Sequence, residues 1–184
     1  MKRAVINNIP NFITCLRIIG TICLWCIEPF TATFFVVYTV SGVSDAVDGI
    51  IARAMKTTSE LGTKLDSIAD IMFYITMTIR VFPVLWEELP VLLWYGVGLI
   101  VVLRIISYAL AAIKYHRFAT LHTYMNKVAS FMWFTVPYAI SMKWTVGMCT
   151  ALFIVSAIGS VEELLIHITR KEYRSNVKSI LVKG

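Results

Sequence analysis

The chain has 184 residues, of which 58% are hydrophobic, and its mean hydropathy is +0.76. Soluble domains of this size are much less apolar, so the composition excludes an ordinary water-soluble protein and indicates a small integral membrane protein. The net charge of +6 does not require a nucleic acid partner, because a basic rim facing anionic membrane lipids accounts for it equally well.

Long apolar runs divide the chain into candidate membrane spans. A span needs about 20 mostly apolar residues. Runs that approach this length lie near residues 11–27, 30–52, 65–86, 89–112, 127–143 and 145–168. Pro29, Pro83 and Pro90 lie at or near the breaks between them. The sequence therefore predicts an all-α fold, a polytopic membrane protein whose six transmembrane helices form a single membrane domain over residues 1–184.

The basic residues orient these spans. If both termini lie on the same side of the membrane, most of the lysines and arginines fall on that side. The positive-inside rule makes it the cytoplasmic side. We therefore expect both termini in the cytoplasm and the protein in a cell membrane, most simply the plasma membrane of a bacterium.

All the aspartates of the chain cluster at the expected cytoplasmic ends of the second and third spans: Asp45, Asp48, Asp66 and Asp70. The first two are separated by one i, i+3 step and the last two by one i, i+4 step, so each pair shares a helical face. Two facing helices joined by a short loop would direct these carboxylates at one point. Because each aspartate inside a span costs about 2.5–3.5 kcal/mol on insertion scales, we expect cations between them.

The ligand type indicates which cation. Oxygen ligands without a neighbouring histidine suit Mg²⁺ or Mn²⁺ better than Zn²⁺. The carboxylates exceed what one Mg²⁺ usually takes from protein, so we expect a two-metal site, whose common chemistry is displacement at phosphorus. Gly49, Ala52 and Gly62 lie on the same faces and would leave room for a large ligand. The alternative is that these small residues only let the helices pack closely.

The spacing of these residues resembles a family signature. Asp45-x-x-Asp48-Gly49-x-x-Ala52-Arg53, followed after eight residues by Gly62-x-x-x-Asp66-x-x-x-Asp70, is similar to the complete signature of the CDP-alcohol phosphatidyltransferase family. That family has six transmembrane helices, and the signature bridges the second and third. The resemblance implies transfer of a phosphatidyl group from CDP-diacylglycerol to a small water-soluble alcohol, with release of CMP. It also implies Mg²⁺ or Mn²⁺ as cofactor and a homodimer within the membrane lipids.

The resemblance also implies roles for individual residues. Metal ligands are implied at all the aspartates of the signature, and Asp70 is the one that we expect to act as general base for the acceptor hydroxyl. Contacts to the CDP-lipid are implied at four positions: Gly49, Ala52, Arg53 and Gly62.

Further segments resemble one branch of the family. "NIPNFITCLR", residues 8–17, is similar to the N-x-P-N-x-x-T-x-x-R element of the phosphatidylglycerophosphate synthase and cardiolipin synthase branch. "LRIISYAL", residues 103–110, and "MNKVAS", residues 125–130, also resemble that branch. The residues expected to line the cavity or to bind an anionic acceptor such as glycerol 3-phosphate are Asn11, Thr14, Arg17, Arg104 and Lys127. The alternatives are an ion pair with a neighbouring carboxylate for Arg104 and a snorkelling side chain for Lys127.

The stretch "LDSIADI" departs from that branch, which reads Leu-Asp-Pro-x-Ala-Asp-Lys. Ser67 replaces the proline and Ile71 the lysine, and the Leu-Asp-Ser-x-Ala-Asp form is closer to phosphatidylserine synthases. Serine and inositol phosphate therefore stay open as acceptors. Outside the family's activity, a divalent-cation transporter would also need intramembrane carboxylates. A catalytically dead homologue acting as a scaffold is a further alternative, although no signature residue is lost.

Polar residues near the end of the last run receive structural roles. Glu162 and Glu163 are expected to be a helix-end feature or a dimer contact rather than catalytic groups. His167 has no metal-ligand spacing to the other histidines and is expected at a solvated interface.

Overall fold

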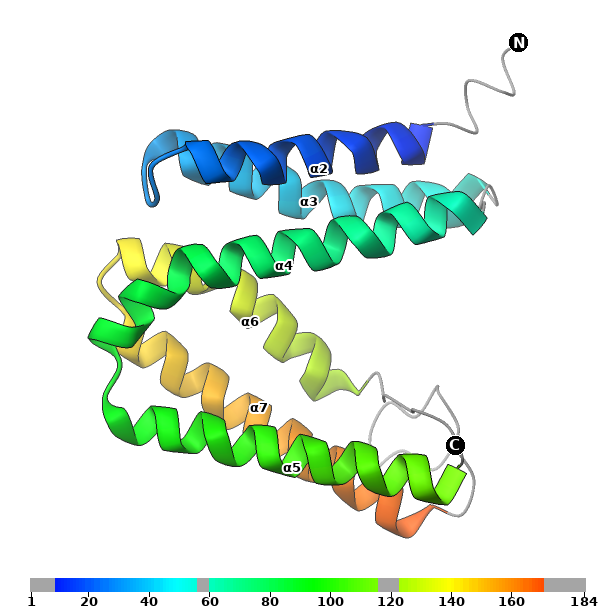
Figure 1. The fold of residues 1–184 in the computed structure, drawn as a ribbon, viewed down its shortest axis with the longest axis vertical. Helices are drawn as coiled ribbons and strands as arrows, with labels where there is room; N and C mark the ends of the chain where they lie inside the picture. The colour runs from blue at the N-terminus through cyan, green and yellow to red at the C-terminus, as the bar shows by residue number, and fades with distance from the viewer. Residues whose placement is uncertain (1–8, 56–59, 116–122, 171–184) are drawn as a thin grey trace. The chain divides into compact units, whose positions relative to one another are not determined.

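The computed structural model describes residues 9–55, 60–115 and 123–170 (Figure 1). Within these ranges the chain forms helices joined by short connections. They are α2 (Ile9–Cys26), α3 (Ala32–Met55), α4 (Glu60–Glu88), α5 (Val91–Tyr115), α6 (Tyr124–Ser141) and α7 (Thr145–Thr169). The described residues contain no strand, so the expected all-α fold is confirmed for them.

The helices agree closely with the apolar runs. Pro83, expected at or near a break, lies inside α4, five residues before this helix ends at Glu88. Proline removes one backbone donor and in water usually kinks or ends a helix. In an apolar segment the chain gains more by keeping its remaining backbone groups hydrogen-bonded, so helices there tolerate proline. Pro137 lies inside α6 in the same way.

Several helices have the length and composition of membrane spans. Among the described residues, those long and apolar enough to cross a bilayer are Lys64–Glu88, Val91–Tyr115 and Thr145–Thr169. Shorter apolar stretches occupy Phe12–Cys26 and Ala32–Ser44. Large apolar side chains point outward, as at Leu92, which is 77% exposed, and Ile113, which is 75% exposed. Such surfaces suit contact with lipid rather than water, so the fold is that of a membrane protein.

The chain divides into two compact units, Met1–Val84 and Leu85–Gly184. In the first unit α2, α3 and α4 lie side by side (Figure 1). α2 approaches α3 closely at Gly20, where an added Cβ would collide with the Ser41 hydroxyl. The rings of Tyr38 on α3 and Phe73 on α4 stack with centroids 5.4 Å apart. These contacts fix how each helix is positioned along the axis of its neighbour within the unit.

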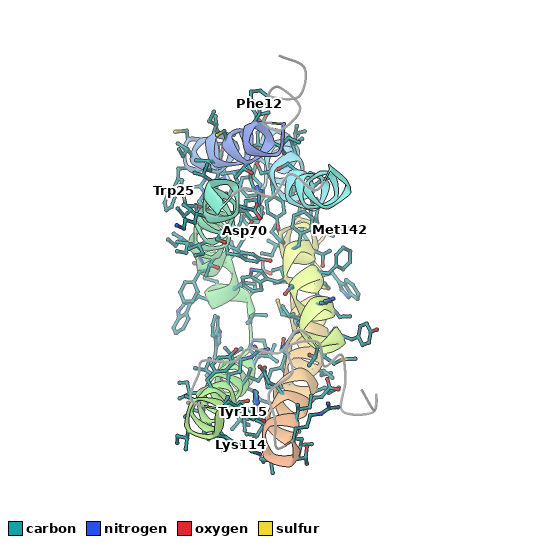
Figure 2. All side chains as sticks on the ribbon, turned by 90° about the vertical axis from the view of Figure 1, so that its right-hand side faces the viewer. Phe12, Trp25, Asp70, Lys114, Tyr115 and Met142 are labelled. Carbon is teal, nitrogen blue, oxygen red and sulfur yellow. The ribbon has the colours of Figure 1, made fainter. Side chains whose placement is uncertain are left out.

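In the second unit α7 packs against both α5 and α6. Lys114, labelled in Figure 2 at the end of α5, donates through Nζ to the carbonyl oxygens of His167 at 2.7 Å and Ile168 at 3.0 Å. A cation at the carbonyl end of a helix satisfies groups that have no partner within the helix and complements the helix dipole. The buried Thr123 caps α6, since its hydroxyl accepts from the backbone N–H of Asn126 at 3.3 Å.

Candidate active site

A buried arginine joins the two aspartates of α4. Arg17 of α2 donates through Nη2 to Oδ1 of Asp66 at 2.7 Å, and through Nη1 to Oδ1 of Asp70. Asp70, labelled in Figure 2, is one helical turn beyond Asp66, so both carboxylates lie on the same face of α4. The predicted convergence of these two carboxylates is therefore present, and a guanidinium fork from another helix holds them.

The arginine is buried more deeply than the two aspartates that it binds. The Arg17 side chain is 1% exposed, whereas those of Asp66 and Asp70 are 42% and 40% exposed. The guanidinium thus lies beneath the carboxylates, on the packed side of the helices, and the carboxylates keep an open side. A charge buried this deeply requires a partner, which the two carboxylates provide.

Polar residues of α2 support Arg17 from its own helix. Thr21 is fully buried and its hydroxyl donates to the backbone carbonyl of Arg17 at 2.8 Å. Thr14, about one turn before Arg17, is buried with 3% exposure. Thr14 and Arg17 were expected to line the mouth of a cavity, but both are packed inside the unit. The side chain of Asn11, also within α2, lies outside the part of the chain that the structure describes.

The first half of the signature lies on α3. The side chains of its members are outside the described residues, although their backbone belongs to the helix: Asp45, Asp48, Gly49, Ala52 and Arg53. Since α3 and α4 run in opposite directions, the Tyr38–Phe73 stack sets their register. Asp45 follows Tyr38 by about two turns, and Asp66 precedes Phe73 by the same distance. The backbone positions of Asp45 and Asp66 therefore stand at about the same level.

The two described carboxylates of this region are of the ligand type that a hard divalent cation prefers. Asp66 and Asp70 are oxygen donors on one face, with open sides, and Gly62 precedes Asp66 by one turn. Two carboxylates are fewer than such a site needs. No group of three His, Cys, Asp or Glu side chains suited to a metal occurs among the described residues. The remaining expected ligands, Asp45 and Asp48, belong to the stretch of α3 whose side chains are not described.

The second unit contains another polar cluster. Arg104 of α5 donates to Oδ1 of Asn126 at 2.9 Å and lies 4.0 Å from the carboxylate of Glu163 on α7. The alternative role considered for Arg104 was an ion pair with a neighbouring carboxylate, and Glu163 provides that carboxylate. Lys127 is exposed on α6, as a snorkelling side chain would be.

Two expectations for the end of α7 are wrong. Glu163 and His167 are each only 1% exposed, so Glu163 is a packed residue rather than a helix-end feature or a dimer contact, and His167 is not at a solvated interface. Glu163 and His167 lie one turn apart on a candidate membrane span, where ionisable side chains usually face the protein interior. This spacing was the signal in the sequence that pointed to a buried face.

Gly159 gives a direct test of how tightly this cluster is packed. A Cβ added at Gly159 would lie 3.1 Å from Met125 Cβ and 3.2 Å from Asn126 Oδ1. We expect Gly159→Ala to reduce the free energy of unfolding by about 1–3 kcal/mol, because overpacking forces neighbours to shift. Gly98→Ala is the matched control, since nothing lies within 4 Å of that position. Thermal unfolding in detergent compares the two; equal melting temperatures would contradict the described packing.

Comparisons with known proteins agree with the signature. The family model described as CDP-alcohol phosphatidyltransferase matches residues 7–167. A curated protein of Blochmanniella floridana, named CDP-diacylglycerol–glycerol-3-phosphate 3-phosphatidyltransferase, is 35% identical over 94 residues, which cover 46% of this chain and 48% of that protein. The similarity thus spans about half the length of that relative, and no solved structure matches. Because the family model covers most of the chain, including the aspartate-bearing helices α3 and α4, the chain belongs to the CDP-alcohol phosphatidyltransferase family.

Proposed function

We propose that this protein transfers a phosphatidyl group from CDP-diacylglycerol to glycerol 3-phosphate and releases CMP. The observation that carries the proposal is the pair of half-exposed carboxylates, Asp66 and Asp70, held on one face of α4 by the buried Arg17. They belong to a signature that is complete in this chain, and the family match covers residues 7–167. Together these features support a site at the start of α4 and the end of α3.

The reaction is a displacement at phosphorus. The acceptor hydroxyl oxygen forms a bond to the phosphorus that carries the diacylglycerol, and the bond from that phosphorus to the CMP oxygen breaks. CMP leaves with the electron pair of that bond. The proton of the attacking hydroxyl passes to a carboxylate, and we assign Asp70 as this base, since general bases act within hydrogen-bond reach of the attacking group. Arg17 beneath it fixes the direction in which the Asp70 carboxylate points.

The metal ligands of the proposed site are the signature aspartates, Asp45, Asp48, Asp66 and Asp70. When bound, Mg²⁺ or Mn²⁺ would offset the negative charge of the pyrophosphate and of the departing CMP. The CDP-lipid contacts are assigned to Gly49, Ala52, Arg53 and Gly62, where small residues leave space beside the backbone. Arg17 offsets part of the carboxylate charge before a cation binds.

The membrane arrangement is part of the same proposal. All the helices α2 to α7 span the bilayer, with both termini and the aspartates on the cytoplasmic side. The diacylglycerol chains then remain in lipid, while CMP and the acceptor exchange with water. The family match runs through both compact units, which supports one transferase domain over residues 1–184. Asn11 belongs to its cytoplasmic mouth, and two copies form a homodimer.

Glycerol 3-phosphate is the proposed acceptor for two reasons. The relative from Blochmanniella floridana carries that acceptor in its name. In addition, Arg104 is 30% exposed and Lys127 is exposed, so both can meet an anion. Serine is the second candidate, because "LDSIAD" resembles the phosphatidylserine synthase form of the signature. Inositol phosphate follows, as another phosphorylated alcohol.

The acceptor is tested by supplying candidates one at a time. The purified protein in detergent receives CDP-diacylglycerol and Mg²⁺ with glycerol 3-phosphate, serine, inositol phosphate or inositol, and CMP release is measured. We expect release with glycerol 3-phosphate at least tenfold above the others. Release with serine instead would keep the reaction and change the acceptor. No release with any acceptor, combined with Mg²⁺ uptake into proteoliposomes, would favour a divalent-cation transporter.

A further inference from the structure

Glu163 of α7 is a carboxylate buried within a candidate membrane span. Its exposure is 1%, and the span runs from Thr145 to Thr169. A charged group there is costly and marks a site with a cationic or hydrogen-bonding partner. Oε2 of Glu163 lies 3.5 Å from Nδ2 of Asn126 and 4.0 Å from Nη1 of Arg104. The carboxylate therefore contacts polar side chains of both α6 and α5.

Asn126 connects Glu163 to Arg104. Its Oδ1 accepts from Nη2 of Arg104 at 2.9 Å, while its Nδ2 donates to Glu163. A guanidinium only donates and an ionised carboxylate only accepts, so these two neighbours together fix which way the amide points. The backbone N–H of Asn126 is held by the Thr123 cap, and Gly159 allows α7 to approach the amide. Three helices thus determine the position of one arginine.

Arg104 retains the capacity to bind an anion. Its side chain is 30% exposed, in contrast to the buried Glu163. Among the described residues its guanidinium makes the bond to Asn126 and a longer one of 3.4 Å to the Tyr108 hydroxyl. A guanidinium has five N–H donors, so donors remain for a ligand. Planar guanidinium forks match phosphate oxygens, and the match depends on orientation.

We infer that Glu163 is a positioning residue that acts through Asn126 to orient Arg104 toward the phosphate of an anionic acceptor. The inference rests on the proposed function for its ligand, a phosphorylated alcohol whose phosphate Arg104 would bind. Glu163 does not itself meet the acceptor, since it is buried behind Asn126. Its negative charge fixes the amide, and the amide fixes the arginine.

The test is Glu163→Gln. Glutamine has nearly the same shape but no negative charge, so its hydrogen bond with Asn126 is weaker and the amide that binds Arg104 is held less firmly. We expect KM for glycerol 3-phosphate to rise about tenfold, while kcat changes by less than about twofold and KM for CDP-diacylglycerol stays constant. Glu163→Asp, which keeps the carboxylate, should recover part of the affinity. Glu162→Gln removes the same charge one residue away and should leave all three parameters unchanged.

Other outcomes overturn the inference or the proposed function separately. If the wild-type protein is active and Glu163→Gln leaves KM for glycerol 3-phosphate unchanged, or raises KM for both substrates alike, Glu163 has only a structural role. If the wild-type protein releases no CMP with any acceptor, the proposed function fails. Binding then decides the inference on its own: glycerol 3-phosphate should raise the melting temperature of wild type but not of Glu163→Gln.

A second variant covers the case in which Glu163→Gln does not fold. Gly159→Ala crowds Oδ1 of Asn126 and leaves both Glu163 and Arg104 in place. It should therefore raise KM for glycerol 3-phosphate severalfold and leave KM for CDP-diacylglycerol unchanged. Gly98→Ala should change neither KM. An unchanged acceptor KM in Gly159→Ala would overturn the inference.

Discussion

Asp70→Asn is expected to abolish nearly all turnover while the protein still binds CDP-diacylglycerol. General-base catalysis contributes about 10²- to 10⁴-fold to rates, and asparagine cannot take up the acceptor proton. Asparagine still offers an oxygen to Arg17, so the packing beneath it is retained. The measurement pairs the rate of CMP release with the rise in melting temperature that CDP-diacylglycerol causes.

Asp66→Asn is the control for Asp70→Asn, because Asp66 bonds the same arginine but is assigned only a metal-binding role. We expect Asp66→Asn to weaken both Mg²⁺ dependence and donor binding. If Asp70→Asn behaves like Asp66→Asn, Asp70 is a metal ligand alone and the base lies elsewhere. Transfer by Asp70→Asn at the wild-type rate would exclude any catalytic role for Asp70.

Arg17→Met should produce the second large effect, on stability and on metal dependence together. The change removes the buried cation and leaves Asp66 and Asp70 to repel each other. Because these carboxylates are partly exposed, the loss is smaller than for a fully buried pair, about 2 kcal/mol in the free energy of unfolding. For a chain of this size that lowers the melting temperature by roughly 4–8 °C. Added Mg²⁺ should raise the melting temperature of Arg17→Met by more than it raises that of wild type.

Two variants separate this electrostatic role from simple loss of packing. Arg17→Lys keeps the charge but not the fork, so it should fall between wild type and Arg17→Met. Arg80→Met removes an arginine of α4 that donates to the backbone carbonyl of Ile27 and has no carboxylate partner among the described residues. It should lower the melting temperature without changing the response to Mg²⁺. An equal Mg²⁺ response in Arg17→Met and Arg80→Met would contradict the role of Arg17.

The helices and the aspartate pair of α4 could be predicted from the sequence because both depend on local spacing. Apolar runs of span length gave the helices to within a few residues, and an i, i+4 step put Asp66 and Asp70 on one face. The predicted run 65–86 includes Pro83, and α4 continues through this proline, because satisfying the backbone within an apolar segment outweighs one missing donor. Rules that treat proline only as a helix breaker do not include this effect of the apolar surroundings.

The partners of the buried arginine and glutamate could not be predicted, because they come from other helices. Arg17 meets carboxylates that follow it by 49 and 53 residues, and Glu163 meets an asparagine 37 residues before it. Spacing along one helix tells which side chains share a face, but not which face another helix covers. The sequence therefore placed Arg17 at a cavity mouth and Glu163 at a helix end, whereas packing buries both.

The most direct test of the central claim is to follow both products of one reaction. Purified protein in detergent is incubated with CDP-diacylglycerol, Mg²⁺ and radiolabelled glycerol 3-phosphate, and both CMP and labelled lipid are quantified, with Asp70→Asn in parallel. We expect equal amounts of CMP and of phosphatidylglycerophosphate from wild type, no product without Mg²⁺, and at least a hundredfold less product from Asp70→Asn. CMP release that does not depend on the acceptor, or no labelled lipid from folded wild-type protein, would contradict the central claim.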